Sequence, residues 1–384
     1  MSLTAYKASD LFRWIKDNDT DFFLLDVRSE SDFGRFKVEG PNPIQMKNVP
    51  YIDFSDEEEE ESVAQVPRDK KIRVVCAREG SAKYVGEVLI KHGFEDVAYL
   101  EGGIKTWGNL LVPKRVDGGA SEYSLYQFIR PAKASCSYGL VYKDELMIFD
   151  PTKEIDFYQK FASEKGCRIV RTFETHLQAD YISGSPAIAR ETGADLMAHE
   201  NDFYGAAFSY QAIQDEQVYH FTDGGPEVKV IHTPGHTPGS TSYVIDDKYM
   251  IAGDTVFLVS IGRPDLGGKV EEWSQLLFET LGTKVGNMDP ELVVLPGHFM
   301  SWDEADSNLI FRDTLASIKE KNRAIFNLDD SAQFLQFIKD NMREQPEVYA
   351  KIRQVNAGRL EVDLDEQNVM DLGKNECAAS AAKK

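Results

Sequence analysis

Four side chains that can bind a metal ion occur in Gly- and Pro-containing turns, each after a strand-like run. They are His176, His236, Asp254 and His298. Glycine and proline are what sharp strand-to-turn junctions require, and such junctions place side chains together at one end of a sheet. A lone histidine is better explained as a structural residue, but four such positions favour a metal site.

Cys76 is a second candidate, because it ends a strand-like run and a short loop then leads into a helix. The stretch reads VVCAREGSAKYV. Backbone N–H groups at a helix start and the positive end of its dipole would favour a thiolate, and Arg78 adds a cation. The pattern predicts a nucleophilic cysteine, with a small buried core residue as the alternative.

The elements that position these residues fall into two halves. Up to about residue 107, buried strand-like runs alternate with helical stretches such as residues 81–93, which predicts a small α/β domain. Residues 113–122 contain Pro, Gly and Ser with little apolar content, which is typical of a linker. The strand-like and helical runs that follow predict a layered sandwich.

Length and charge limit the partners. At 384 residues the chain suits two domains, and a net charge of -21 argues against nucleic acid and anionic membranes. We find no leader and no apolar run that could span a bilayer, so we expect a cytoplasmic protein. The four scattered cysteines fit free thiols in a reducing compartment.

The first half resembles the rhodanese family. LLDVRSESDF matches its early strand, CAREGSA its active-site loop and VAYLEGGIKTW its closing signature. The resemblance implies that Cys76 accepts a sulfane sulfur and passes it to a thiol or to sulfite. The loop amides from Ala77 to Ser81 would hold the bound anion. Ser81 stands where many family members have a basic residue, so the preferred donor stays open.

The second half resembles the metallo-β-lactamase superfamily, whose fold is an αββα sandwich. Its histidine and aspartate ligands match the four turn residues above and Asp180. Two further positions differ, because the stretch THLQADYISG has Gln178 and Tyr181 where the family has histidines. Amide and phenol are poor zinc ligands, so this departure disfavours hydrolysis with two metal ions.

The remaining ligands, His176, His236 and Asp254, have the composition of the facial triad of non-haem Fe(II) oxygenases. The persulfide dioxygenases, a branch of the superfamily, use this set. GRPDL, RPAKASCSYGLVY and QPEVYAKIRQVNAG resemble stretches of that branch. We therefore expect one Fe(II) per chain and no nucleotide cofactor. Arg263 is the candidate for binding a substrate carboxylate. Four residues would orient ligands or bound water: Gln178, Asp180, Tyr181 and His298.

These inferences predict a rhodanese domain over residues 1–115, a linker at 116–121, a dioxygenase domain at 122–370 and a polar tail at 371–384, with Cys377 incidental. The predicted enzyme oxidises a low-molecular-weight persulfide, such as glutathione persulfide, with O2 to sulfite, and interconverts thiosulfate and persulfide through Cys76. A homodimer is possible. Two alternatives stay open: a zinc thioester hydrolase of glyoxalase II type fused to a rhodanese, and a non-enzymatic sulfur carrier or sensor.

Overall fold

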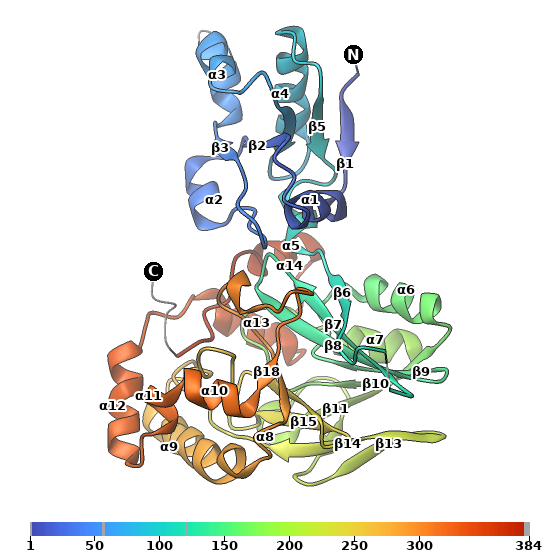
Figure 1. Cartoon of the computed structure of the whole chain (residues 1–384), viewed down its shortest axis with the longest axis vertical. Helices are drawn as coiled ribbons and strands as arrows, with labels where there is room; N and C mark the ends of the chain where they lie inside the picture. The colour runs from blue at the N-terminus through green and yellow to red at the C-terminus, as the bar shows by residue number, and fades with distance from the viewer. Residues whose placement is uncertain (1, 56–57, 120, 380–384) are drawn as a thin grey trace. The chain divides into compact units, whose positions relative to one another are not determined.

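The chain forms two compact units. The computed structural model describes residues 2–55, 58–119 and 121–379. The first unit consists mainly of residues up to Leu110, and most of the remaining chain forms the second (Figure 1).

The first unit is an α/β domain around a parallel sheet with the order β1-β5-β4-β2-β3. Its strands are β1 (Thr4–Tyr6), β2 (Phe22–Asp26), β3 (Met46–Asn48), β4 (Lys71–Val75) and β5 (Val97–Leu100), and its helices are α1 (Ala8–Lys16), α2 (Glu30–Arg35), α3 (Glu59–Ala64), α4 (Gly80–Lys91) and α5 (Ile104–Gly108). Four of the five residues of β4 are buried, as expected for a parallel strand covered on both faces.

The second unit contains two sheets. The first has the order β12-β11-β10-β9-β8-β7-β6 and the second the order β13-β14-β15-β16-β17-β18. The strands of the first sheet are β6 (Val112–Arg115), β7 (Ser124–Arg130), β8 (Ser135–Tyr142), β9 (Glu145–Phe149), β10 (Arg168–Phe173), β11 (Asp195–His199) and β12 (Gln211–Ile213). Those of the second are β13 (Val218–Phe221), β14 (Gly224–His232), β15 (Thr241–Ile245), β16 (Tyr249–Gly253), β17 (Val293–Pro296) and β18 (Asp313–Thr314).

Helices pack on both sheets and against the loops at their ends. They are α6 (Ile155–Lys165), α7 (Ser185–Thr192), α8 (Glu200–Phe203), α9 (Val270–Glu279), α10 (Leu315–Lys321), α11 (Arg323–Phe326), α12 (Ser331–Asn341), α13 (Val348–Asn356) and α14 (Leu364–Met370). Phe161 of α6 and Ile188 of α7 pack with Ile148 of β9, whereas Leu277 of α9 and Phe334 of α12 join the core on the second sheet. This arrangement confirms the predicted αββα sandwich.

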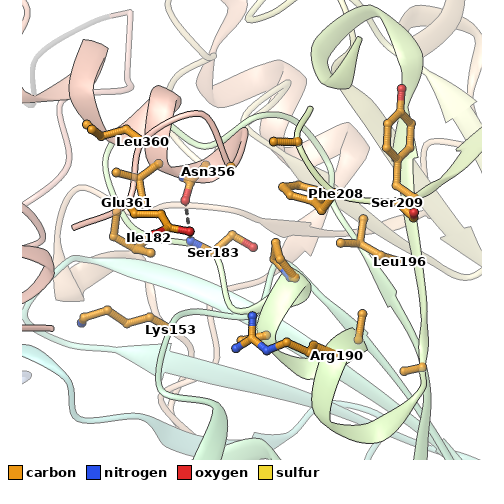
Figure 2. A pocket seen from close by; sticks show the side chains of 18 of the residues that line it. Lys153, Ile182, Ser183, Arg190, Leu196, Phe208, Ser209, Asn356, Leu360 and Glu361 are labelled. Atoms are coloured by element: carbon orange, nitrogen blue, oxygen red, sulfur yellow. Dashed lines mark hydrogen bonds between the residues drawn. The ribbon is translucent and has the colours of Figure 1, made fainter. Parts of the chain in front are cut away.

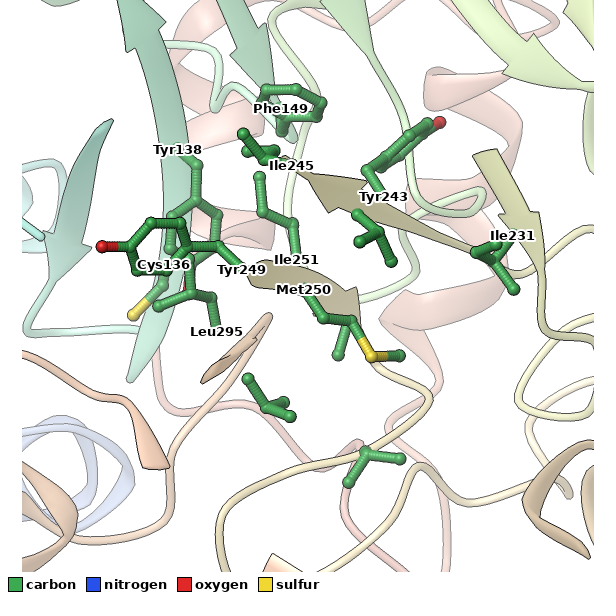
Figure 3. Close-up of a cluster of buried hydrophobic side chains, with 14 of the residues drawn as sticks. Cys136, Tyr138, Phe149, Ile231, Tyr243, Ile245, Tyr249, Met250, Ile251 and Leu295 are labelled. Atoms are coloured by element: carbon green, nitrogen blue, oxygen red, sulfur yellow. The ribbon is translucent and has the colours of Figure 1, made fainter. Parts of the chain in front are cut away.

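The main core lies between the two sheets (Figure 3). Tyr138, Phe149, Tyr243 and Ile251 belong to one cluster of buried side chains that the inner faces of both sheets supply. Cys136 is part of the same cluster, so its thiol fills core space. Because this core fixes both sheets, it also fixes the strand ends at which the candidate metal ligands lie.

The boundary predicted between the two domains is wrong. β6 pairs antiparallel with β7, so residues 112–115, which we expected in the first domain, form the edge strand of the first sheet of the second unit. The predicted linker at 116–121 is therefore the connection between these two strands, with residue 120 outside the described part. Pro113 is tolerated because edge strands leave some N–H groups without a ladder partner.

The predicted polar tail also differs from the structure over its described residues. Cys377, Ala378 and Ala379 are buried, and Ala378 forms an antiparallel bridge with Gly262. Residues 380–384 lie outside the described part of the chain. None of the described helices combines the length and apolar character that crossing a membrane requires.

Candidate metal centre and thiol site

Three predicted metal ligands converge in the second unit. His176 follows β10, His236 follows β14 and Asp254 follows β16 directly, so each lies at the end of a strand. One ligand atom from each lies within 4.8 Å of the other two, and all three residues are buried. The core of the sandwich places these strand ends together.

The atoms that face one another at this site are suited to a cation. His176 Nε2 and Asp254 Oδ2 are buried and have no hydrogen-bond partner among the described residues. Asp254 Oδ2 lies 3.8 Å from His176 Nε2 and 3.5 Å from His236 Nε2, close to the spacing of about 3 to 3.5 Å between ligands of one ion. A metal ion would satisfy these buried polar atoms, so the residues present fit the group that the sequence implies.

Hydrogen bonds to the other ring nitrogens leave the Nε2 lone pairs of both histidines available to a metal ion. His236 Nδ1 donates to the carbonyl oxygen of Arg263 at 3.0 Å. The Thr175 hydroxyl donates to Asp150 at 2.8 Å and therefore accepts from His176 Nδ1 at 2.9 Å. Burial lowers the pKa of His176 to about 3, so this imidazole is neutral, as a metal ligand must be.

His298 is the third predicted histidine, and it lies between two carboxylates. Its Nδ1 is 2.7 Å from Asp254 Oδ1, and its Nε2 is 2.9 Å from Asp180 Oδ2. Burial acts to lower the pKa of His298, but the charges of both carboxylates raise it to about 10. His298 is therefore an imidazolium ion that donates two hydrogen bonds. Because a protonated imidazole has no lone pair to offer, this geometry gives His298 a positioning role beside the ligands.

The same cation determines the state of Asp254. Burial acts to raise the pKa of Asp254, but the charge of His298 and its hydrogen bond outweigh burial and hold that pKa below its ordinary value. Asp254 is thus an anion at neutral pH, with Oδ1 bonded to His298 and Oδ2 directed at the ligand histidines.

Gln178 and Tyr181, the two departures from the family pattern, hold the ligand loop in place. The Gln178 side chain hydrogen-bonds to the carboxylate of Asp150, and the Tyr181 hydroxyl lies 3.4 Å from the carbonyl oxygen of the same residue. Sequence reasoning missed Asn356 of α13, whose amide donates to the carbonyl oxygens of both loop residues at 2.9 and 2.8 Å. Only the fold brings α13 to this loop.

Arg263 does not lie as we expected for a substrate-binding residue. Its guanidinium is buried and makes two hydrogen bonds to the carboxylate of Asp265, and it also donates to the carbonyl oxygens of Arg343 and Glu376. These partners occupy the donors that a substrate carboxylate would need. The predicted role of Arg263 in substrate binding is therefore corrected to a structural one.

Cys377, which we expected to be incidental, also lies beside this centre. Cys377 Sγ, a carboxylate oxygen of Asp180 and a ring nitrogen of His298 lie within 4.8 Å of one another, all buried. The expectation that Cys377 is incidental is thus wrong. No motif surrounds Cys377, and it lies far from His298 in the sequence, so the sequence did not indicate that the two residues meet.

A cavity of about 1010 Å³ in the second unit is lined in part by Ile182 and Ser183, which belong to the loop that follows His176. Figure 2 shows Lys153, Arg190, Phe208 and Glu361 among its lining residues. None of the predicted site residues lines it. Its link to the metal centre is Asn356, whose side-chain oxygen accepts from the Ser183 amide at 2.9 Å (Figure 2).

Cys76 lies where the sequence predicts, between β4 and the start of α4, and is buried. Burial raises the pKa of Cys76, and the charge of Asp26 acts in the same direction, whereas backbone amides of Ala82, Arg78 and Ser81 act to lower it. Two of the amides expected to hold the bound anion, those of Arg78 and Ser81, face the sulfur together with the amide of Ala82. Burial outweighs them in the free protein, so a Cys76 thiolate stays a prediction.

Gly103 explains part of the closing rhodanese-like signature. A Cβ atom at this position would lie 2.0 Å from the carbonyl oxygen of Arg78, and its φ of +73° is one that side chains rarely adopt. The next residue, Ile104, donates its amide proton to the carbonyl oxygen of Cys76 at 2.9 Å. Close backbone contact at Gly103 thus fixes the loop that carries the thiol.

Two family models match the chain. Residues 7–110 match the model of the rhodanese-like domain, and residues 133–306 match that of the metallo-beta-lactamase superfamily. Their order agrees with the two units of the fold.

Individual relatives resemble the second unit. The probable metallo-hydrolase YqgX of Bacillus subtilis (strain 168) is 27% identical over an alignment of 200 residues, and the match covers 47% of this chain and 93% of that protein. A hydroxyacylglutathione hydrolase of Rhizobium etli is 29% identical over 138 residues, and the matched part spans 36% of this chain and about half (51%) of that relative. A solved metallo-beta-lactamase from Staphylococcus aureus subsp. aureus COL has a TM-score of 0.54 at 24% identity, covers 62% of this chain and 73% of its own, and supports the fold.

Proposed function

Because the chain carries a rhodanese-like domain followed by a domain of the metallo-beta-lactamase superfamily, we propose that it is a bifunctional enzyme of sulfur metabolism. In this proposal the metal centre oxidises a low-molecular-weight persulfide with O2 to sulfite, using one Fe(II). Cys76 transfers sulfane sulfur between persulfide, sulfite and thiosulfate.

The ligand set is the observation that carries the proposal. Two imidazoles and one carboxylate face a common point, which is the facial-triad composition of non-haem iron oxygenases. The next histidine, His298, has both ring nitrogens hydrogen-bonded to carboxylates, those of Asp254 and Asp180. Gln178 and Tyr181 stand where two-metal enzymes of the superfamily have histidines, and this disfavours the second metal ion that two-metal hydrolysis would require.

Fe(II) held by His176, His236 and Asp254 would supply the redox chemistry for the oxidation of persulfide sulfur with O2. The protein's own residues supply geometry and charge. Thr175 and the Arg263 carbonyl fix the rings of the two ligand histidines, and His298 fixes the carboxylate of Asp254. Burial of all three ligands keeps bulk water away from the reacting sulfur.

At the other site, the Cys76 thiolate attacks the sulfane sulfur of a donor. The donor's bond to that sulfur breaks, its electron pair leaves with the remaining thiolate or sulfite, and Cys76 becomes a persulfide. A second thiolate or sulfite then takes the sulfur and restores Cys76. The amides of Arg78, Ser81 and Ala82 surround the sulfur and stabilise negative charge on it.

The second candidate is a zinc thioester hydrolase with a fused rhodanese-like domain. Similarity to a hydroxyacylglutathione hydrolase favours it. Gln178 and Tyr181 count against it, since an amide and a phenol stand where two-metal enzymes of the superfamily have histidines.

Metal content and O2 uptake separate the two candidates. We would measure both on the full chain purified without added metal, with glutathione persulfide as the substrate. The variants are His176→Ala and the control His220→Ala, which removes an exposed histidine of β13. The proposal predicts about one iron per chain and O2 uptake, both lost only in His176→Ala. Zinc without O2 uptake, together with cleavage of S-lactoylglutathione, would instead establish the hydrolase.

A further inference from the structure

Asp202 lies beside the loop that carries the first ligand histidine. It belongs to α8, which follows β11, and β11 pairs in parallel with β10. His176 follows β10, so the ends of two neighbouring strands bring α8 next to this ligand. Phe203 of α8 is buried in a small apolar cluster, and Leu177, the residue after His176, packs against that cluster. The first sheet thus fixes the position of Asp202.

The carboxylate of Asp202 binds both loops that carry a ligand histidine. Its Oδ2 atom accepts from the backbone amide of Leu177 at 2.9 Å and from the hydroxyl of Thr237 at 2.6 Å. Its Oδ1 atom accepts from the backbone amide of Gly239 at 2.7 Å. Leu177 and Thr237 each directly follow one of the ligand histidines. One side chain therefore connects the two segments from which the imidazole rings project.

The directions of these hydrogen bonds suit a carboxylate. The Thr237 hydroxyl donates to Asp202, so in the 2.8 Å pair between the hydroxyls of Thr237 and Ser240 the donor is Ser240. The Ser240 hydroxyl oxygen accepts from the Thr237 amide at 2.9 Å. The three groups that face Asp202 are thus all donors. A carboxylate accepts on both oxygens, whereas the amide of asparagine would direct N–H groups at one of these donors.

The close approach of Asp202 also explains Gly239. A Cβ atom at position 239 would lie 2.5 Å from the carboxyl carbon of Asp202, which is closer than Cβ atoms come to other atoms in proteins. The neighbouring Asn201 donates to the carbonyl oxygen of Pro238 at 3.3 Å. Two consecutive residues of α8 therefore bind the loop after His236, and glycine leaves the room that the carboxylate needs.

The two rings that these loops carry require accurate placement. Their centroids lie 4.9 Å apart and their planes are nearly perpendicular, at 88°. The Nε2 atoms of His176 and His236 lie 3.8 and 3.5 Å from the same oxygen of Asp254. Groups of a metal site must be held within about 0.5 Å of their working geometry, so the backbone under both rings has to be fixed.

From these contacts we propose that Asp202 is a positioning residue of the metal centre, which sets the spacing of His176 and His236 by binding the loop after each of them. This inference deepens the proposed function and rests on it for the presence of a metal ion at the three ligands.

The test measures binding of Co(II) to the full chain after removal of metal, because the visible absorption of Co(II) reports the geometry of its ligands. In Asp202→Asn we expect the Co(II) affinity to fall about tenfold or more and the absorption bands to shift. Asp306→Asn is the matched control, since Asp306 also accepts from two backbone amides and one side chain, in a loop that carries none of the three ligands. The control should leave affinity and absorption unchanged.

Variants of Thr237 test whether Asp202 acts through the second ligand loop. Thr237→Val removes the hydroxyl donor and should weaken Co(II) binding, whereas Thr237→Ser keeps the donor and should restore it. In the double variant of Asp202→Asn with Thr237→Val, the fold-loss should be smaller than the product of the two single losses, because both changes remove the same hydrogen bond. If Asp202→Asn fails to fold, the comparison of Thr237→Val with Thr237→Ser still decides, and equal binding by these two variants would overturn the inference.

Unchanged Co(II) affinity and absorption in folded Asp202→Asn, or a loss no larger than that in Asp306→Asn, would also overturn it. The same holds if Asp202→Asn lowers only the stability of the metal-free protein. The readout needs neither O2 nor persulfide, so failure of the proposed dioxygenase shows separately as absent O2 uptake. Weakened Co(II) binding in Asp202→Asn without O2 uptake by the unchanged protein would keep this inference and reject the dioxygenase, and O2 uptake with unweakened Co(II) binding would do the reverse.

Discussion

His298 holds one oxygen of Asp254, through a 2.7 Å hydrogen bond between Nδ1 and Oδ1, while the other oxygen of that carboxylate faces His176 and His236. One oxygen of the Asp254 carboxylate is thus hydrogen-bonded to His298, and the other faces the position that a metal ion would occupy. Because a carboxylate held in this way loses little freedom on binding an ion, the pair pre-organises the site.

Removing that cation should destabilise the protein. His298→Ala removes the cation that hydrogen-bonds to the buried carboxylates of Asp254 and Asp180, so we expect a loss of about 3 kcal/mol or more in the free energy of unfolding. Denaturant unfolding of metal-free protein measures it. The control His220→Ala, at an exposed position, should change stability by less than about 0.5 kcal/mol. Equal stability of the two variants would contradict the ionic role of His298.

Thr175 should control metal affinity. Thr175→Val removes the hydroxyl that accepts from His176 Nδ1, and loss of such a partner typically weakens metal binding about 10- to 100-fold. Competition with a chelator measures the affinity. Thr172→Val is a matched control in the same strand region, because the Thr172 hydroxyl is buried and has no hydrogen-bond partner among the described residues. If both variants weaken binding alike, the effect belongs to packing.

Arg263 and Asp265 should behave as a structural ion pair. Arg263→Met leaves the buried Asp265 carboxylate without its partner and should cost about 3 to 5 kcal/mol, whereas Arg263→Met with Asp265→Leu should recover most of that loss. Thermal unfolding and the KM for the persulfide separate the roles. If the double variant regains its stability but has a raised KM for the persulfide, Arg263 binds the substrate and its role is not only structural.

The metal ligands and Arg263 differ in how far their surroundings could be predicted from the sequence. His176, His236 and Asp254 follow buried strands, and strands in a sandwich deliver their ends to one edge, so their meeting could be predicted. The environment of Arg263 could not, because its partners include carbonyl groups of Arg343 and Glu376, whose position only the folded chain sets.

Cys377 and β6 were missed for a similar reason. The polar residues around the cysteine and the Pro and charges of residues 112–115 resemble a tail and a linker in composition. Both segments nevertheless pair with strand-like partners, Cys377 with Arg263 and β6 with β7. Short edge pairings of this kind depend on backbone groups and leave little trace in the pattern of side chains.

Gly103 should be needed for sulfur transfer at Cys76. Gly103→Ala places a Cβ atom against the carbonyl oxygen of Arg78 and shifts the loop, and displacement of about 1 Å can cost about 100-fold in rate. The control Gly93→Ala has a similar positive φ of +84° with nothing within 4 Å, so it shares only the backbone strain of about 1 to 2 kcal/mol. Thiocyanate formation from thiosulfate and cyanide measures the rate. Equal rates in both variants would exclude the steric explanation.

The reactivity of Cys76 should rise with pH well into the alkaline range. Burial raises the pKa of its thiol above the ordinary value of 9.0, so at neutral pH most molecules carry the protonated, unreactive form. The thiolate fraction, and with it the alkylation rate by iodoacetamide, should increase about tenfold per pH unit from pH 7 and still be rising at about pH 9. The measurement uses Cys377→Ser protein and the peptide that contains Cys76. A rate that levels off near neutral pH would mean that the amides of Arg78, Ser81 and Ala82 outweigh burial, so that the free enzyme already holds a thiolate.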